Sequence, residues 1–328
     1  MEQCGVRMNI LRFLMGMVLW TVASSVFAQD YPAKPVRFIV AGPPAGATDY
    51  IARLLAARLS ETWKQPVTVE NLAGGSGLIG TRALMNSAPD GYTIGIGHLG
   101  THGIVPNMHN PPPYDVLRDF APVVLLGNTW DILVVPPPVR VKTVPELMAM
   151  ARDRPDALSY GSIGIGQPQH FLGYLLTRSA GVSMTHVPYK GSAPAITDLL
   201  AARITTMFAS AGAIVPYLKD GRLRALAITA PKRSPILPDV PTFAELGMPD
   251  LLLTTWVGVF APAKTSPQVV ARISSDVSQI LNLPDIRAKL AAQFFDPLGG
   301  TPEEFSALLE KEVSRWKSIV RDSGVRAE

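Results

Sequence analysis

The stretch V-R-F-I-V-A-G-P-P-A-G-A-T-D-Y-I-A-R-L-L-A-A-R-L, Val36 to Leu59, decides the fold class. It begins with a short apolar run rich in β-formers, Val36 to Val40, and continues through a loop of small residues. The apolar residues that follow have the spacing of a helix with one buried face: Ile51, Leu54, Leu55 and Leu59. This order of strand, loop and helix is the repeating unit of α/β proteins with a mainly parallel sheet.

The same alternation continues along the chain. Prolines gather between these runs, where they cannot continue helices or central strands and therefore indicate loops. Near the carboxyl end, Thr301 and Glu304 form a capping box with Pro302 at the first helical position, which predicts a long final helix. Further runs that predict strands are Val67 to Val69, Thr93 to Gly97, Leu158 to Gly161, Thr185 to Pro188, Thr205 to Ala209 and Leu223 to Ile228.

The amino terminus has the pattern of a signal peptide. Arg7 and Arg12 precede an uncharged apolar stretch that ends at Ala28, and small residues stand before the expected cut. We therefore assign residues 1–28 to a signal peptide cleaved after Ala28, and expect export to the periplasm. The alternative is an uncleaved anchor, but the stretch is shorter than the roughly 20 residues that a membrane span needs.

Composition excludes several classes of function. The only cysteine, Cys4, lies in the leader, so the exported chain has no thiol for a disulfide, a metal site or a nucleophile. The net charge of +4 is small and scattered, which gives no footprint for nucleic acid. A chain of 328 residues is long enough to divide its core between two domains.

Three loops follow predicted strands and lead toward helices, so they are expected to converge on one crevice. The first is A-G-P-P-A-G-A-T-D, Ala41 to Asp49, whose small residues let the backbone approach a ligand. The exposed amides at the start of its helix favour an anion such as a carboxylate. Thr48 or Asp49 could instead serve only as a helix cap.

The second loop is H-L-G-T-H-G-I-V-P-N, His98 to Asn107. Its two histidines stand four residues apart, but the glutamate of a zinc protease motif is missing and the glycine-rich segment is not expected to be helical. We therefore predict no metal site, and take the hydroxyl of Thr101 as a hydrogen-bond donor to a ligand.

The third loop is G-S-I-G-I-G-Q-P-Q-H, Gly161 to His170. It lacks the third glycine of a dinucleotide loop, and the chain has neither a phosphate-binding G-x-x-x-x-G-K nor a G-x-S-x-G nucleophile motif. We expect no cofactor. Ser162 can donate to an oxyanion, whereas His170 is either a ligand contact or a helix-start residue bonded to a neighbouring loop.

These loops and several other motifs make the sequence resemble the Bug-type extracytoplasmic binding receptors of the tripartite tricarboxylate transporter family. The resemblance spans nearly the whole exported chain. The motifs, in order, lie at Tyr31 to Pro35, Pro43 to Asp49, Glu70 to Gly77, Pro89 to Thr93, Gly100 to His102, Asp119 to Val123, Tyr160 to Gly164, His186 to Pro194, Leu237 to Thr242 and Gly299 to Phe305.

The resemblance implies a type II periplasmic-binding-protein fold, an α/β architecture of two lobes with a ligand cleft between them. Lobe 1 would comprise residues 29–139 and 255–328, and lobe 2 residues 140–254. Carried over by motif, the ligand-binding residues would be Pro44, Ala45, Gly46, Ala47, Thr48, Asp49, Thr101, His102, Ser162, Gly164 and His170, with Ala209 and Ser210 at the end of a lobe 2 strand.

Departures from the family pattern bear on the ligand. Many relatives carry Phe-Asp-Asn where this chain has Phe208, Ala209 and Ser210, so no acid is expected there to hold an ammonium group. Gly42 and Leu78 make the neighbouring wall roomier and more apolar. We therefore hypothesise a monocarboxylate with an uncharged tail, aliphatic or aromatic. The alternative is that Asp49 serves an amino group of the ligand.

The predicted function is that of a periplasmic substrate-binding protein, not an enzyme, which captures a small carboxylate and delivers it as a monomer to a tripartite tricarboxylate-type permease. One alternative is a sensory adaptor that presents its ligand to a membrane sensor. A less favoured one is a small hydrolase that uses Ser162 with His102 or His170.

Overall fold

The computed structural model describes residues 31–44, 46–155 and 157–326. The chain divides after Lys34, and the described helices and strands belong to the unit from Pro35 onward. The predicted signal peptide, residues 1–28, lies outside the described residues. Within the described ranges, none of the helices combines the length and apolar character needed to cross a membrane.

The first group of strands, which we call sheet A, is built around the opening stretch. In it, β1 (Val36–Val40) lies between β2 (Val67–Asn71) and β3 (Thr93–His98), and all three are parallel. The helices α2 (Ala47–Trp63) and α3 (Leu78–Met85) follow β1 and β2. The predicted strands are confirmed here, with ends that differ by a residue or two.

Two strands that the sequence did not reveal connect the molecule. The strand β4 (Phe120–Val135) pairs with the antiparallel β9 (Thr254–Pro262), which also pairs with β3. The register shifts next to Pro122 and Gly127. A proline and a glycine inside a strand weaken its sequence pattern, which is why β4 escaped prediction.

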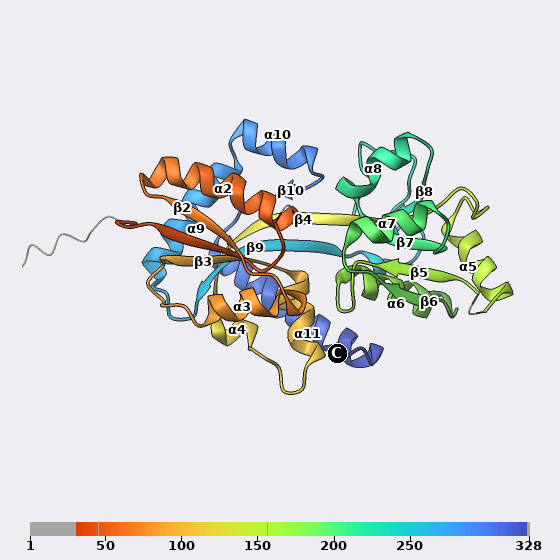
Figure 1. Cartoon of the computed structure of the whole chain (residues 1–328), viewed down its shortest axis with the longest axis horizontal. Coiled ribbons are helices and arrows are strands. Elements are labelled where there is room, and N and C mark those ends of the chain that lie inside the picture. The colour runs from red at the N-terminus through yellow and green to blue at the C-terminus, as the bar shows by residue number, and fades with distance from the viewer. Residues whose placement is uncertain (1–30, 45, 156, 327–328) are drawn as a thin grey trace, which may run out of the picture. The chain divides into compact units, whose positions relative to one another are not determined.

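A second group of strands, sheet B, uses the far end of β4. There β4 no longer pairs with β9 but with the antiparallel strands β7 (Thr206–Ser210) and β8 (Arg224–Ile228). The strand β5 (Ser159–Ser162) lies between β6 (Thr185–Pro188) and β7 and is parallel to both. Figure 1 shows β4 and β9 side by side, with β1 to β3 near one end and β5 to β7 near the other. Their helices are α5 (Val144–Asp153), α6 (Pro168–Ala180), α7 (Ser192–Leu200) and α8 (Ala211–Lys219).

The carboxyl-terminal helices pack back onto sheet A. They are α9 (Pro267–Leu281), α10 (Pro284–Ala292) and α11 (Pro302–Ser323), and the short strand β10 (Asp296–Pro297) precedes α11. Earlier in the chain, the short helix α4 (Val116–Asp119) directly precedes β4. The predicted capping box is confirmed, because the Thr301 hydroxyl accepts from the amide of Glu304 and the Glu304 carboxylate accepts from the amide of Thr301. The fully buried Trp316 of α11 meets Phe171 of α6, with ring centroids 5.3 Å apart, so this helix contacts elements of both sheets.

Candidate ligand-binding site

A cavity of about 570 Å³ lies where two sets of three parallel strands end. From sheet A it is lined by residues that follow β1 and β2 and by His98 at the end of β3; from sheet B, by residues that follow β5 and β6 and by Ser210 at the end of β7. Thr129 of β4 and Thr255 of β9 also line it. The carboxyl ends of parallel strands are where open α/β sheets bind ligands, so we take this cavity as the candidate site.

Five helices begin at this cavity without a side-chain cap. Their amino-terminal amides therefore lack the usual acceptor from a Ser, Thr, Asp or Asn side chain. By contrast, α4, α5, α9 and α11, which start elsewhere, are capped by Asp115, Thr143, Ser266 and Thr301; α10 is uncapped but does not border the cavity. The uncapped N-cap residues that line the cavity are Gly46 of α2, Gly77 of α3, Gln167 of α6, Gly191 of α7 and Ser210 of α8.

The first loop contributes its backbone and is held by a chain of polar side chains. Pro44, Gly46, Ala47 and Thr48 line the cavity, whereas Ala45 lies outside the described residues. The structure buries Asp49 and pairs its carboxylate with Arg53 at 3.0 Å. Arg53 in turn donates to Asn71 at 2.9 Å, and Asn71 donates to the Gly42 carbonyl at 3.2 Å. The helix begins at Ala47 with Gly46 as its N-cap, so Thr48 and Asp49 are not caps.

The second loop is helical, which contradicts the expectation from its glycines. A π-helical turn spans Leu99–Ile104 and a 3-10 turn spans Val105–Met108. The turn is stabilised by its own cap: the His98 imidazole accepts from the amide of Gly100 at 3.0 Å, and the Thr101 hydroxyl accepts from the amide of His98 at 3.1 Å. These hydrogen bonds offset the conformational freedom of glycine.

Thr101 and His102 are therefore used inside the protein. The hydroxyl of Thr101 lies 2.9 Å from Nδ1 of His102, and the His102 ring stacks on Phe260 with centroids 4.1 Å apart. Both residues are buried and neither lines the cavity, whereas His98 does. Across the described ranges, no group of three or more histidine, cysteine or acidic residues could hold a metal ion.

The third loop also turns its predicted residues inward. Ser162 is fully buried and lies 2.7 Å from Nε2 of His186, not beside His102 or His170. His170 stacks on His186 at 3.8 Å, and its Nδ1 accepts from the amide of Gly166 within its own loop, not from a neighbouring loop. Ser162 therefore pairs with neither of the two histidines that the hydrolase alternative requires.

Two more predicted positions complete the comparison. Gly164 does not border the cavity, and Ala209 is buried in the core of sheet B. Its neighbour Ser210 does line the cavity, as side chains on a strand alternate between faces.

Comparison with known proteins agrees with this geometry. Residues 51–325 match the family model described as the tripartite tricarboxylate transporter family receptor. The chain belongs to this receptor family. The protein BugT of Bordetella pertussis is 35% identical over 97% of this chain and 99% of its own length. Family relatives and neighbouring structures are periplasmic binding proteins, so the chain is a solute-binding receptor and not an enzyme.

Two solved structures confirm the predicted type II periplasmic-binding fold. The structure of Rpa4515 from R. palustris with adipate has a TM-score of 0.82 and 34% identity, and covers 90% of the receptor and 99% of that chain. MatC from Rhodopseudomonas palustris with bound malate has a TM-score of 0.78 and 32% identity, and covers 88% of the receptor and 100% of that chain.

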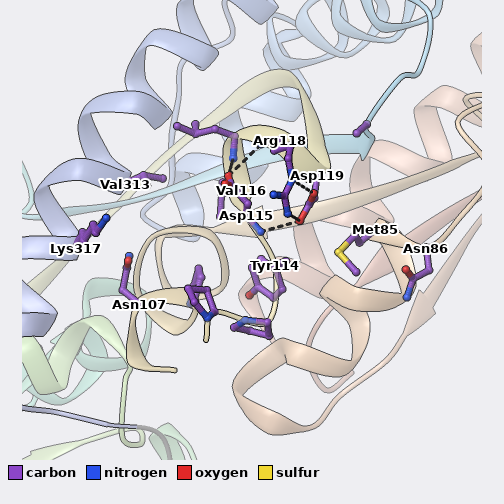
Figure 2. Close-up of a pocket in the computed structure, with 15 residues that line it drawn as sticks. Met85, Asn86, Asn107, Tyr114, Asp115, Val116, Arg118, Asp119, Val313 and Lys317 are labelled. Atoms are coloured by element: carbon purple, nitrogen blue, oxygen red, sulfur yellow. Dashed lines mark hydrogen bonds and ion pairs between the residues drawn. The ribbon is translucent and has the colours of Figure 1, made fainter. Parts of the chain in front are cut away.

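The receptor also has a larger hollow, of about 820 Å³, away from these strand ends (Figure 2). Its acidic groups already have partners: Asp119 pairs with Arg118 at 2.9 Å and accepts from the amide of Asp115 at 2.8 Å. Asp115 caps α4. Among the described residues, no uncapped α-helix begins at this hollow, and its carboxylates are engaged, so we prefer the smaller cavity as the ligand site.

Several lining residues were missed by sequence reasoning. Gln167 and Gln169 stand within the quoted third loop, but only its glycines, Ser162 and His170 were considered. Thr129 and Thr255 lie on β4 and β9, the two strands that were not identified. The signal that could have revealed these two residues is a polar threonine within an otherwise largely apolar run of the sequence.

The buried histidines predict that the receptor loses stability in mild acid. Burial lowers the pKa of His98, His170 and His186 to about 4 and that of His102 to about 3. An unfolded histidine titrates near 6.5, so below that pH the unfolded chain binds more protons than the folded one. We expect the histidine contribution to the free energy of unfolding to be complete above pH 6.5 and to be lost progressively toward pH 4. Urea titrations at several pH values would measure this loss.

One buried acid opposes this trend and supplies a control. Burial raises the pKa of Asp131 to about 6, so the folded carboxyl takes up its proton at a higher pH than the unfolded one. Acidification therefore stabilises the fold through this group, but one carboxyl is outnumbered by four imidazoles. Asp131→Asn should steepen the loss in acid. Equal stability of the wild type at about pH 7 and about pH 5 would contradict the assignment.

Proposed function

We propose that the receptor captures a small carboxylate in the cavity at the strand ends and delivers it to a membrane permease of the tripartite tricarboxylate type. The observation that carries the proposal is the convergence of five uncapped helix starts on one cavity. Amides at a helix start attract an anion by hydrogen bonding and by the helix dipole. Adipate and malate are the molecules named for two structural neighbours, which supports the same ligand class here.

The proposal includes the organisation that the sequence suggested. The signal peptide, residues 1–28, directs the chain to the periplasm, where it acts as a monomer. Lobe 1 comprises residues 29–139 and 255–328, and lobe 2 residues 140–254. The start of β9 at Thr254 lies at the second boundary, whereas β4 already passes from sheet A to sheet B at Asp131. Ligand capture then draws on loops of both lobes.

Ligand binding should stabilise the receptor without changing the ligand. At a carboxylate concentration a hundredfold above Kd, binding to the folded state adds about 2.7 kcal/mol to the free energy of unfolding. Thermal shift across a panel of aliphatic and aromatic carboxylates would detect this, and the matching amides, which carry no charge, are the control. NMR of the ligand after prolonged incubation should show no product.

Two results would reject the proposal. Equal stabilisation by carboxylates and their amides would mean that the helix starts do not select an anion. Conversion of the bound molecule would mean that the cavity performs chemistry.

A further inference from the structure

A buried acid lies behind one wall of the cavity. Asp131, the residue at which β4 leaves β9 for sheet B, is 2% exposed. Its carboxylate accepts a hydrogen bond from Nε2 of Gln169 at 3.0 Å. Gln169 is itself 7% exposed and lines the cavity. The glutamine therefore separates the buried charge from the ligand space.

The hydrogen bond determines which way the glutamine amide faces. An ionised carboxylate can only accept hydrogen bonds, so Asp131 pairs with the amide nitrogen of Gln169. The amide oxygen of Gln169 then points away from Asp131. That oxygen, Oε1 of Gln169, is buried and has no hydrogen-bond partner among the described residues. The hydroxyl of Thr255, which also lines the cavity, is likewise buried and unpartnered within the described ranges.

We propose that Gln169, oriented by Asp131 and assisted by Thr255, forms a subsite for a hydrogen-bond donor on the ligand. The ligand is then a carboxylate that also carries a hydroxyl, amide or ammonium group, and not one that places a second carboxylate at this wall. This inference rests on the proposed function, because it presumes that the first carboxylate is held at the helix starts. Gln169 acts as a specificity-determining residue, and Asp131 as a positioning residue that acts through it.

Hydrogen-bond chemistry explains the selectivity. An unpaired buried acceptor is costly, and a donor on the ligand removes that cost. A carboxylate at the same place could accept from the Thr255 hydroxyl, but it would face the amide oxygen of Gln169 and, behind it, the charge of Asp131. At neutral pH that charge is present, because the pKa of Asp131 is raised by burial only to about 6.

The position of Asp131 bears on an expectation from the sequence. Ala209 and Ser210 suggested that no acid stands at the end of β7. In the sheet, however, Asp131 is the register partner of Ser210, so the neighbouring strand supplies an acid at that level. A hydroxyl-bearing tail satisfies both the uncharged character first hypothesised and the acceptors found here.

The test compares ligands of equal length that differ only at the far end. The butyrate series is butyrate, gamma-hydroxybutyrate, gamma-aminobutyrate and succinate; the hexanoate series is hexanoate, epsilon-hydroxyhexanoate, epsilon-aminohexanoate and adipate. Calorimetry on the receptor should show, in the series that fits, about tenfold tighter binding of the hydroxy or amino member than of the unsubstituted or doubly charged member.

Asp131→Asn should remove this preference. The new amide can either accept from Nε2 or donate to Oε1 of Gln169, so the glutamine is free to present Nε2 to a ligand carboxylate. The dicarboxylate should then gain about tenfold relative to the hydroxy or amino member. Thr255→Val, which keeps the shape of the side chain, should weaken only the hydroxy and amino members, and tests the subsite even if the Asp131 variant does not fold.

The outcomes separate the two proposals. If carboxylates bind but the wild type prefers succinate or adipate, or if neither variant changes the order, the donor subsite is wrong and the carboxylate receptor stands. If no member of either series and no other carboxylate binds the wild type, the proposed function fails and the subsite fails with it.

Discussion

Gly46→Val is expected to weaken carboxylate binding at least about a hundredfold, because it covers the amides at the start of α2. Each charge-assisted bond to a carboxylate contributes about 1.5 to 3 kcal/mol, so the loss of two accounts for a factor of this size. Gly46 is the N-cap of α2 and lines the cavity. A branched side chain there stands between the ligand and the backbone.

The fold should tolerate this change. The backbone of Gly46 has φ −78° and ψ 167°, an extended conformation open to any residue, so valine introduces no strain there. An added Cβ would lie 3.5 Å from the Pro43 carbonyl, an ordinary contact. Gly46 is therefore not required here for the conformational freedom of glycine.

Calorimetry with the best carboxylate found for the wild type measures the effect, and circular dichroism checks that the variant is folded. Gly46→Ala is the matched control, since a single methyl group fits and should cost far less affinity than valine. A folded Gly46→Val variant with unchanged Kd would remove this loop from the binding site.

Trp316→Ala is expected to have the largest effect on stability, about 3 to 5 kcal/mol. The side chain is fully buried in α11, and its ring contacts Phe171 of α6 edge to face. Its indole nitrogen donates to Glu312 at 3.2 Å. On the other side lies the π-helical turn of the second loop, where a Cβ at Gly103 would come 3.4 Å from the indole. Truncation therefore leaves a cavity between three elements that cannot easily collapse together.

Thermal and urea denaturation followed by circular dichroism would measure this loss. Trp316→Phe is the control, because a phenyl ring fills much of the same space and should lose well under half as much. A Trp316→Ala variant as stable as the wild type would show that the contact between α11 and α6 contributes little.

The local features of this protein could be predicted because they depend on residues close together in the chain. The strand from Val36 to Val40 and the helix after it follow from apolar spacing, and the capping box at Thr301 follows from residues three apart. The anion-binding character of the first loop also follows locally, since small residues and a helix start stand side by side. These features are carried by short-range hydrogen bonds and hydrophobic periodicity.

Only the tertiary structure decided which polar side chains face the ligand. Thr101 and His102 were expected in the site but bond to each other, and Ser162 finds its partner in His186 on the next strand. In the reverse direction, Gln169 and Asp131, 38 positions apart, meet at the cavity wall. The physical reason is that polar groups in a buried environment must find partners wherever the packed sheets bring them, and the pairing of β4 with β7, β8 and β9 is a property of distant segments that no local pattern records.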